Sequence, residues 1–431
     1  MAALTLLNSL ITAVRAGSLT PAPRMAAPAP SITSVTSRAN VHASAASSST
    51  LAVGKQQFVD IGANLLDSMF EGDYRGKQAH PPDIDDVLAR AASAGVQRAI
   101  VTAGTLEESR AALDFVRTRR AAGSPVKLYC TVGVHPTRSL EFVPPMERAA
   151  IEEAMKVLAD AGDDGAASAQ IKIDDLEAGL IGGGETAAAF AAHRDAHIAA
   201  LRAVLDEGIA EGIAVAVGEC GLDYDRLQFC PVGVQKLGFE AQLALAGATA
   251  LPLFLHNRNT GGDFGAVCVA QQRAMAAGGV VHSFDGDVEE LDQLVSLGLH
   301  IGLNGCSLKT AENLEMAAQV PLNALHLETD APWCAIRRTH AGHAHTRPLL
   351  NPATGEGYVE VKKEKWQSGA CVKDRCEPCH IVHVLQVVAG ARVDAASAGK
   401  ADAEGEEERV AAAAYANSMQ MFWPAAAVAR R

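Results

Sequence analysis

The sequence predicts one (β/α)8 barrel, the α/β fold known as a TIM barrel, and the main evidence is a series of short apolar runs. Eight such runs follow one another from Phe58 onward, separated by longer stretches rich in Ala, Leu, Glu and Arg. The runs lack strict polar alternation, as expected for parallel strands that are covered on both sides. No short repeat accompanies them, which argues against a solenoid. The expected strands are Phe58–Gly62, Arg98–Gly104, Lys127–Val134, Ala214–Glu219, Pro252–His256, Val280–His282, His300–Leu303 and Leu325–Asp330.

Helix-compatible segments lie between the expected strands. They include Asp83–Ala94, Leu106–Arg120, Pro231–Ala246 and Val288–Leu297. Eight strand–helix units in series favour a closed barrel over an open doubly wound sheet. A barrel typically needs about 250 residues. The chain has 431, so we expect insertions in the barrel.

We expect the barrel domain to span residues 58–424, with insertions near 160–186, 341–365 and 391–408. The first insertion has Gly- and Asp-rich breakers around one amphipathic piece, and the second is rich in Pro, Gly and charge. The third is rich in Ala, Gly and Glu, and we expect a solvated loop there before a helix-like run at Val410–Phe422. No boundary of a second domain is predicted.

The first 57 residues contain no Asp or Glu and are rich in Ala, Ser, Thr and Pro, with Arg15, Arg24 and Arg38 spaced along them. This composition is typical of an organellar transit peptide. We therefore expect a mitochondrial or chloroplast location. The alternative is a plain disordered tail on a cytoplasmic or nuclear protein.

The formal net charge of −13 gives the chain no general attraction for nucleic acid or anionic membranes. A polyanionic substrate would need local features such as a metal ion, a few Arg or Lys side chains and backbone N–H groups. The nine cysteines are scattered, which indicates reduced thiols and not a disulfide framework. No apolar run reaches the roughly 18 residues that a membrane helix needs.

Polar side chains stand at the ends of five expected strands. His135 follows the third strand, Glu219 ends the fourth, His256 the fifth, His282 the sixth and Asp330 the eighth. The carboxyl ends of barrel strands meet at one rim, which carries the active site in enzymes of this fold. We therefore expect these five side chains to converge.

Two imidazoles and two carboxylates form a mixed nitrogen and oxygen set that suits Zn²⁺, Mn²⁺ or Mg²⁺, with positions left for water. A bound divalent ion generates hydroxide near neutral pH. Each residue alone has a structural alternative, since a histidine there can be a hydrogen-bonded core residue and an Asp can cap the next helix. The coincidence at five strand ends favours a metal site. The expected ligands are Glu219, His256, His282 and Asp330.

Several segments resemble the TatD family of metal-dependent deoxyribonucleases, which belong to the amidohydrolase-like barrel superfamily. The segments are Phe58–Leu65, Val132–Pro136, Gly218–Asp225, Leu253–Asn259, Val281–Gly286 and Leu327–Cys334. Four further segments resemble the eukaryotic TatD DNase domain-containing type. These are Phe70–Gly76, Asp225–Pro231, Asn304–Thr310 and Glu377–His380. The resemblance covers roughly Phe58 to Pro424, apart from the insertions.

This resemblance implies the same four metal ligands and gives further roles. Glu219 would bridge two ions if two bind, and Asp330 would also act as the general base that orients the attacking water. His135 matches a histidine that contacts the scissile phosphate. Arg258 is our own candidate for a second phosphate contact, because a guanidinium binds a phosphate with two parallel hydrogen bonds.

One departure concerns the first strand. Many superfamily members carry an Asp-x-His-x-His sequence there, and this chain has Gly62 and Asn64 at the two histidine positions. Two ligands of one metal position are therefore missing. We expect one firmly held ion, with a second that binds weakly or arrives with the substrate.

The function implied by the resemblance is metal-dependent hydrolysis of DNA by activated water, in the 3′→5′ direction on single strands. The acidic net charge predicts that the DNA is bound weakly, and we expect a monomer. One alternative is a deacylase or amidohydrolase on the same barrel, for example one acting on aminoacyl-tRNA, because metal hydroxide also attacks carbonyl groups. Another alternative is a binding protein without catalytic activity.

Two other sequence patterns could indicate a cofactor site or a base-stacking site. Cys376–His380 matches the C-x-x-C-H haem pattern and, with Cys371, a zinc cluster, but the family resemblance already explains its Glu-Pro-Cys-His part. Trp333 and Trp366 are candidates for stacking on a base, with packing as the alternative.

Overall fold

The computed structural model describes residues 56–160, 163–351, 354–396 and 403–424. All of them lie in one compact unit, Gly54–Arg431. The segment expected to be a transit peptide, residues 1–57, falls outside the described residues except for its last two.

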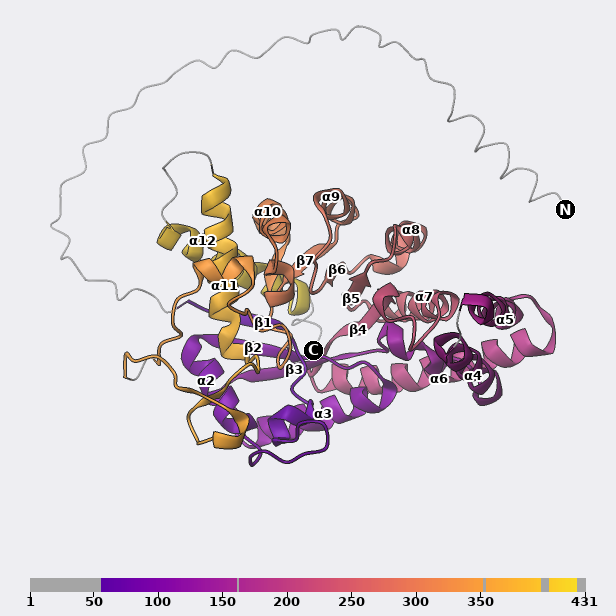
Figure 1. Ribbon diagram of the computed structural model, residues 1–431, viewed down its shortest axis with the longest axis horizontal. Helices are drawn as coiled ribbons and strands as arrows, with labels where there is room; N and C mark the ends of the chain where they lie inside the picture. The colour runs from indigo at the N-terminus through magenta and orange to yellow at the C-terminus, as the bar shows by residue number, and fades with distance from the viewer. Residues whose placement is uncertain (1–55, 161–162, 352–353, 397–402, 425–431) are drawn as a thin grey trace, which may run out of the picture. The chain divides into compact units, whose positions relative to one another are not determined.

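Eight parallel strands form one sheet in which each strand pairs with its neighbours in chain order (Figure 1). The last strand meets the first through a parallel bridge between Ala63 and Ala331 and a hydrogen bond of 2.8 Å from Asp330 N to Gly62 O. The sheet is therefore a nearly closed barrel, as the sequence predicted. The strands are β1 (Phe58–Ala63), β2 (Val96–Val101), β3 (Lys127–Val132), β4 (Ala214–Asp223), β5 (Leu253–Arg258), β6 (Gly279–Val281), β7 (His300–Leu303) and β8 (Leu325–Leu327).

Every expected strand overlaps an observed one, and the differences lie at the ends. The fourth strand runs four residues beyond its expected end at Glu219, because Gly221, Leu222 and Asp223 stay paired with β5. The eighth ends at Leu327, before the expected end at Asp330. Asp330 has a left-handed backbone, with φ of 52°, and such a residue cannot continue a strand.

Helices follow most of the strands and cover the outside of the barrel. They are α2 (Ile84–Ala94), α3 (Leu106–Ala121), α4 (Pro145–Asp160), α5 (Asp163–Ile181), α6 (Gly184–Ala210), α7 (Val232–Thr249), α8 (Asp263–Ala270), α9 (Val288–Ser296), α10 (Ala311–Gln319), α11 (Ile381–Ala395) and α12 (Ala403–Phe422). The four helices expected from the sequence are confirmed within three residues at each end. Their starts follow local caps: Thr105 accepts from Glu108 N at α3, and Asp287 accepts from Glu290 N at α9.

The amino end of the barrel is closed by α12. Phe422 packs in one buried cluster with Ile61, Val215 and Phe254 from the strands. At the same end, the guanidinium of Arg98 lies 4.4 Å from the ring centroid of Trp423. The opposite, carboxyl end is therefore the side of the barrel on which a site can form.

The long connection between β3 and β4 contains α4, α5 and α6, which lie beside α7 (Figure 1). The amphipathic piece expected within residues 160–186 is α5, which buries Ile173 and Leu180. Its Glu177 accepts a hydrogen bond of 2.9 Å from Val234 N at the start of α7.

The expectation of a solvated loop at residues 391–408 is wrong at both ends of that range. Helix α11 continues to Ala395 and α12 already begins at Ala403, while residues 397–402 lie outside the described part of the chain. Glu406 is buried against Arg392, with 2.8 Å between the paired atoms, and Glu407 pairs with Arg347 at 2.7 Å. These partners neutralise glutamates that the composition alone assigned to solvent.

The range 341–365 is mostly irregular, with the 3-10 helices η8 (Ala341–His345) and η9 (Lys363–Lys365). Its short strand β9 (Glu360–Val361) pairs with β10 (Cys371–Val372). Of the helices in the described residues, none has the length and apolar character needed to cross a bilayer.

Two histidines, the partly buried His300 and the buried His326, join the last two strands to α12. Ser418 Oγ donates to Ala414 O, so it accepts from His326 Nδ1 at 2.8 Å. His326 Nε2 must then accept from His300 Nδ1 at 2.9 Å, and the whole chain of bonds requires a neutral His326. Burial, together with His300, lowers the pKa of His326 well below its usual range.

This network predicts a pH-dependent stability. Below about pH 6.5 the unfolded chain protonates this histidine while the folded protein does not, so the free energy of unfolding falls by up to about 1.4 kcal/mol per pH unit. We expect His326→Asn, which keeps a donor toward Ser418, to have a shallower slope between pH 6.5 and 5. Urea unfolding in a chelating buffer measures both slopes. Equal slopes for the two proteins would contradict the neutral network.

Candidate metal centre

Three side chains from neighbouring strands meet at the carboxyl end of the barrel. Glu219 Oε1 lies 2.8 Å from His256 Nδ1 and 2.6 Å from His282 Nε2. The two ring nitrogens are 3.2 Å apart. All three residues are buried, and the structure thus brings together three of the four expected ligands.

The local sequence of β4 allows this close approach. Gly218 and Gly221 both have positive φ, and a Cβ atom at either would overlap a carbonyl oxygen of β5. Because neither residue has a side chain, the two strands lie close together on both sides of Glu219. The carboxylate therefore reaches the imidazole of His256.

The electrostatics of the cluster favour a positive charge between the three side chains. Burial would raise the pKa of Glu219, but the nearby His282 and His135 hold it well below its usual range. Burial would lower the pKa of His282, but the carboxylates of Glu219 and Glu328 raise it well above its usual range. Opposite charges at short range stabilise the charged form of each group in this way.

Glu328 lies behind the ring of His282, on the side away from Glu219. Its Oε1 accepts hydrogen bonds from Ser283 N at 2.5 Å and Asn304 Nδ2 at 3.1 Å, and lies 3.6 Å from His282 Nδ1. A carboxylate on that side favours a proton on Nδ1, which leaves the lone pair of Nε2 facing Glu219. Glu328 was not among the site residues predicted from the sequence.

Asp223 lies behind the ring of His256 in the same way. It also was not among the predicted site residues. Its buried carboxylate oxygen Oδ2 lies 3.3 Å from His256 Nε2, which favours a proton on that nitrogen and leaves the lone pair of Nδ1 facing Glu219. A signal was available in the sequence, because residues two and four positions apart on a strand share one face. Asp223 is four positions after Glu219.

The donor set fits a divalent cation. With a carboxylate behind each ring, two ring nitrogens and one carboxylate oxygen face a common point. Neighbouring ligands of an ion bound at about 2.0 to 2.2 Å are roughly 3 Å apart, close to the observed separations. His256 also lies within 4.8 Å of His135 and Asp223 in a second possible donor group. A neutral imidazole has one lone pair, so His256 serves one group at a time.

Asp330 stands beside this cluster. Asn64 Nδ2 donates to its Oδ1 at 2.8 Å and Cys334 Sγ to its Oδ2 at 3.1 Å. Burial raises its pKa to about 6. Its carboxylate is outside the groups of donors, among the described residues, that lie within 4.8 Å of one another. The structure therefore places Asp330 near the three donors but does not join it to them.

His135 presents a donor to the site. Thr137 N donates to its Nδ1, so the ring proton is on Nε2, which lies 3.4 Å from Glu219 Oε1. Burial lowers the pKa of His135 to about 3. A neutral ring whose N–H group lies beside Glu219 suits a hydrogen bond to a substrate oxygen at the site.

Arg258 ends β5 and already has partners. Its guanidinium forms an ion pair with Asp285 and lies 3.3 Å from Ser283 O. Within the described chain, its hydrogen bonds and ion pair go to Ser283 and Asp285 and not to the three clustered donors. A phosphate at this position would compete with Asp285.

The structure also accounts for the absent histidines of the first strand. A Cβ atom at Gly62 would lie 2.8 Å from Glu328 Oε2 and 2.9 Å from Phe254 Cζ, so a histidine would not fit without movement. Asn64 accepts from Thr102 Oγ1 at 2.6 Å and holds Asp330. These positions support the site but do not ligate.

Cys371, Cys379 and His380 form a further group of possible ligands within 4.8 Å. Glu377 N donates to His380 Nδ1 at 3.0 Å, so the proton of a neutral ring is on Nε2 and no lone pair remains for an ion. This geometry opposes the zinc cluster. Trp366 donates to Asp83 at 3.1 Å and stacks on His80, as in the packing alternative, whereas Trp333 is 49% exposed.

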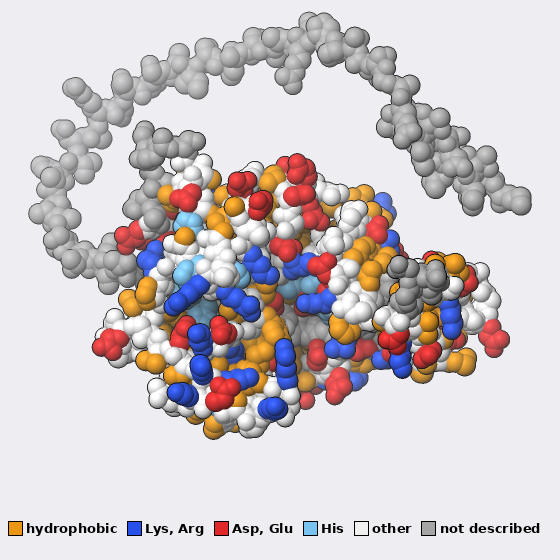
Figure 2. Space-filling model, viewed as in Figure 1, with side chains coloured by type: hydrophobic (Ala, Val, Ile, Leu, Met, Phe, Trp, Pro, Cys, Tyr) orange, Lys and Arg blue, Asp and Glu red, His pale blue; other side chains and the backbone are white. Residues whose placement is uncertain are grey.

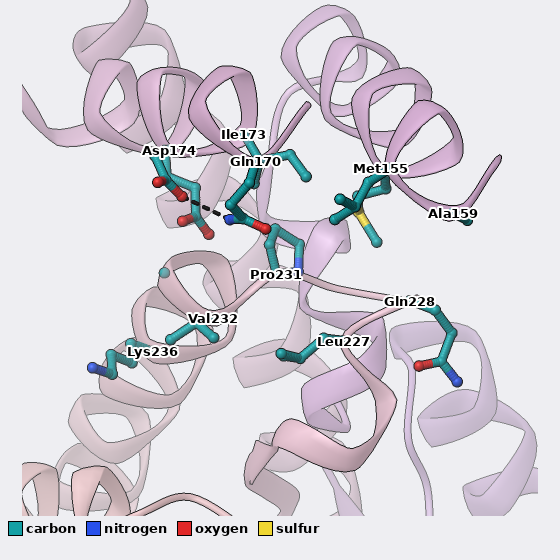
Figure 3. A pocket seen from close by; sticks show the side chains of 13 residues that line it. Met155, Ala159, Gln170, Ile173, Asp174, Leu227, Gln228, Pro231, Val232 and Lys236 are labelled. Carbon is teal, nitrogen blue, oxygen red and sulfur yellow. Dashed lines mark hydrogen bonds between the residues drawn. The ribbon is translucent and has the colours of Figure 1, made fainter. Parts of the chain in front are cut away.

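Two cavities lie away from these donors. One, of about 530 Å³, is formed by α4, α5 and the start of α7, with Met155, Ile173 and Lys236 among its walls (Figure 3). The other, of about 700 Å³, is lined by Tyr74, Trp333 and residues of the segment around η9. None of the six expected site residues lines either cavity.

Comparison with known proteins gives a family match along nearly the whole barrel. The sequence model described as "TatD related DNase" matches residues 59–422. The "Deoxyribonuclease Tat-D" of Schizosaccharomyces pombe is 36% identical over 77% of this chain and 88% of its own length. The protein of the same name from Saccharomyces cerevisiae is 33% identical over 77% of this chain and 85% of its own length. A Yersinia pseudotuberculosis protein named "3'-5' ssDNA/RNA exonuclease TatD" is 29% identical over 77% of this chain and 91% of its own length.

Solved structures agree on the fold. A TatD family hydrolase from Entamoeba histolytica superposes with a TM-score of 0.64 and 29% identity over 86% of this chain and 99% of its own. An uncharacterised amidohydrolase from Saccharomyces cerevisiae superposes with a TM-score of 0.68. It is 29% identical over 85% of this chain and 100% of its own.

The orienting role of Asp223 is testable through metal affinity. We expect Asp223→Asn to weaken binding of Zn²⁺ or Mn²⁺ by about tenfold or more, as the loss of such a carboxylate partner does in other metal sites. Isothermal titration of the chelator-treated protein measures this. The control is Asp225→Asn, which alters a carboxylate bonded to Asn259 on the same loop and should bind like the wild type. Equal losses in the two variants would contradict the assigned role.

Proposed function

This chain belongs to the TatD family of deoxyribonucleases, and on that premise we propose that it shortens single-stranded DNA from the 3′ end with a divalent cation held by Glu219, His256 and His282. The observation that carries the proposal is the convergence of one carboxylate oxygen and two ring nitrogens within 3.2 Å at the barrel rim. A barrel enzyme carries its active site at that rim. The direction of degradation and the single-stranded substrate follow the name of the bacterial relative.

The cation would act as a Lewis acid and make water nucleophilic near neutral pH. Around it, the residues of the chain have separate tasks. His135 Nε2 donates a hydrogen bond to a non-bridging phosphate oxygen. Asp330, held by Asn64, accepts the proton of the attacking water as the general base.

Two imidazoles in the donor set favour a transition ion such as Zn²⁺ or Mn²⁺ over Mg²⁺. We propose one firmly held ion, since Gly62 and Asn64 supply no further ligand. A second ion would have to be held partly by the substrate phosphate.

Weak binding of a single strand fits the charge distribution. The net charge of −13 opposes general attraction to DNA. On the face shown in Figure 2, however, Lys and Arg side chains gather beside histidines near the centre, with some Asp and Glu among them and more toward the edge. Arg258 is the side chain that we propose for a second phosphate contact, in exchange for Asp285. The exposed Trp333, three positions after Asp330, is our candidate for stacking on a base.

We also propose import into a mitochondrion or chloroplast, which rests on the acid-free composition of residues 1–57. A fluorescent protein fused to residues 1–57 should enter the organelle, whereas a fusion of residues 58–431 should stay outside. Microscopy with markers of both organelles tests this. Identical distributions of the two fusions would refute the transit function.

The nuclease proposal predicts a defined product pattern. A single-stranded oligonucleotide labelled at its 5′ end should yield a ladder that shortens from the 3′ end with Mn²⁺ or Mg²⁺ and remain intact in EDTA. Asp330→Asn should lower kcat by about 100-fold or more, the usual contribution of a general base. The exposed Asp374→Asn is the matched control.

Two results would refute this proposal. One is full cleavage in EDTA, and the other is a kcat for Asp330→Asn equal to that of the control. An aminoacyl-ester substrate assayed in parallel tests the deacylase alternative, which predicts ester cleavage without a DNA ladder.

A further inference from the structure

Two cysteines meet at the rim of the barrel beside the candidate site. Cys306 lies in the 3-10 helix η6 (Gly305–Leu308) after β7, and Cys334 lies in the segment after β8. Their sulfur atoms are 2.9 Å apart. Both residues are half-buried, whereas the other seven cysteines are buried. Small solutes can therefore reach this pair more easily than the other thiols.

The backbone holds both cysteines in place. Asn304 caps η6 and accepts a hydrogen bond of 2.8 Å from Cys306 N. Gly305 allows the two segments to touch, because a Cβ atom there would overlap the carbonyl oxygen of Cys334. A disulfide has a bond length of about 2.05 Å, so the sulfurs need to close by only about 1 Å.

Cys334 also touches the candidate site. Its thiol has one proton, which it can donate either to Cys306 Sγ or to Asp330 Oδ2, 3.1 Å away. The other oxygen of Asp330 is held by Asn64. A change at Cys334 therefore alters one of the two described side-chain donors to this carboxylate.

We propose that Cys306 and Cys334 are a redox modification site, in which a peroxide converts the two thiols into a reversible disulfide that lowers nuclease activity. The claim about activity rests on the proposed function, whereas the claim about the disulfide does not.

The chemistry balances with hydrogen peroxide as the two-electron oxidant. The thiolate of Cys306 attacks one peroxide oxygen, an S–O bond forms, the O–O bond breaks, and the departing hydroxide takes a proton to become water. The sulfur of Cys334 then attacks Cys306, the S–S bond forms, and the sulfenic oxygen leaves as a second water with the proton of Cys334. The two sulfurs together lose two electrons, and a dithiol reductant reverses the change.

The surroundings of Cys306 suit the first step. The hydrogen bond from Cys334 lowers the pKa of Cys306 to about 6 in spite of burial, and the positive charges of Lys309 and Arg258 contribute. Thiolates are the nucleophilic form of cysteine.

In the reduced protein the single proton of Cys334 alternates between Cys306 Sγ and Asp330 Oδ2, and the disulfide removes it from both. Asn64 is then the remaining side-chain donor of the described pair, and Oδ2 loses its partner. A lost hydrogen bond to a charged group typically costs about tenfold or more in an equilibrium or a rate. We therefore expect the oxidised protein to be about tenfold less active.

The test uses the full chain treated with a small excess of hydrogen peroxide in a chelating buffer, which prevents metal-catalysed oxidation. Peptide mapping by mass spectrometry without reduction should find Cys306 linked to Cys334, and dithiothreitol should remove the link. After transfer into Mn²⁺, nuclease activity should be about tenfold lower and recover with dithiothreitol.

Cys306→Ser is the informative variant, because Cys306 does not contact the candidate ligands. Cys306→Ala is a second version of the same test. Both should keep their activity after peroxide. Cys268→Ser, which alters a buried cysteine of α8, is the control and should respond like the wild type.

The modification site, its effect on activity and the proposed nuclease function are each overturned by a different result. Absence of the 306–334 link, or a link between Cys371 and Cys379 in its place, overturns the modification site. A complete 306–334 link with unchanged nuclease activity overturns the regulatory effect. A protein that forms the link but cleaves no DNA in either redox state refutes the proposed function while the disulfide stands.

Discussion

The arrangement of this site depends on one electrostatic constraint, which is that three electron-rich atoms face one another away from water. Glu219 Oε1, His256 Nδ1 and His282 Nε2 lie within 3.2 Å of one another. Three lone pairs at such distances repel unless a positive charge lies between them. A proton can fill that role, as the raised pKa of His282 indicates, and a divalent cation can fill it with all three atoms as ligands.

The rest of the rim maintains this constraint. Asp223 and Glu328 stand behind the two imidazoles, and their negative charges favour ring protons on that side, away from the centre. The glycines of β4 let the strands approach, and Gly62 leaves room for Phe254 and Glu328. A site built on strand ends is rigid, which suits metal-assisted hydrolysis, because the ligands need no reorganisation when the substrate arrives.

Much of this was predictable because periodicity and position carry the information. Each strand showed as an apolar run, and Glu219, His256 and His282 stood out because each is a polar residue at the end of such a run. The roles of Asp223 and Glu328 depend on which ring nitrogen each carboxylate faces, and a sequence does not show this. The burial of Glu406 and Glu407 was mispredicted because their partners Arg392 and Arg347 lie 14 and 60 residues away.

Anomalous X-ray diffraction from crystals grown with Zn²⁺ or Mn²⁺ would locate the bound ion. We expect one strong peak within about 2.0 to 2.3 Å of Glu219 Oε1, His256 Nδ1 and His282 Nε2. A fully loaded crystal with its ion bound instead between His135 and Asp223, or at the Cys371 group, would contradict it.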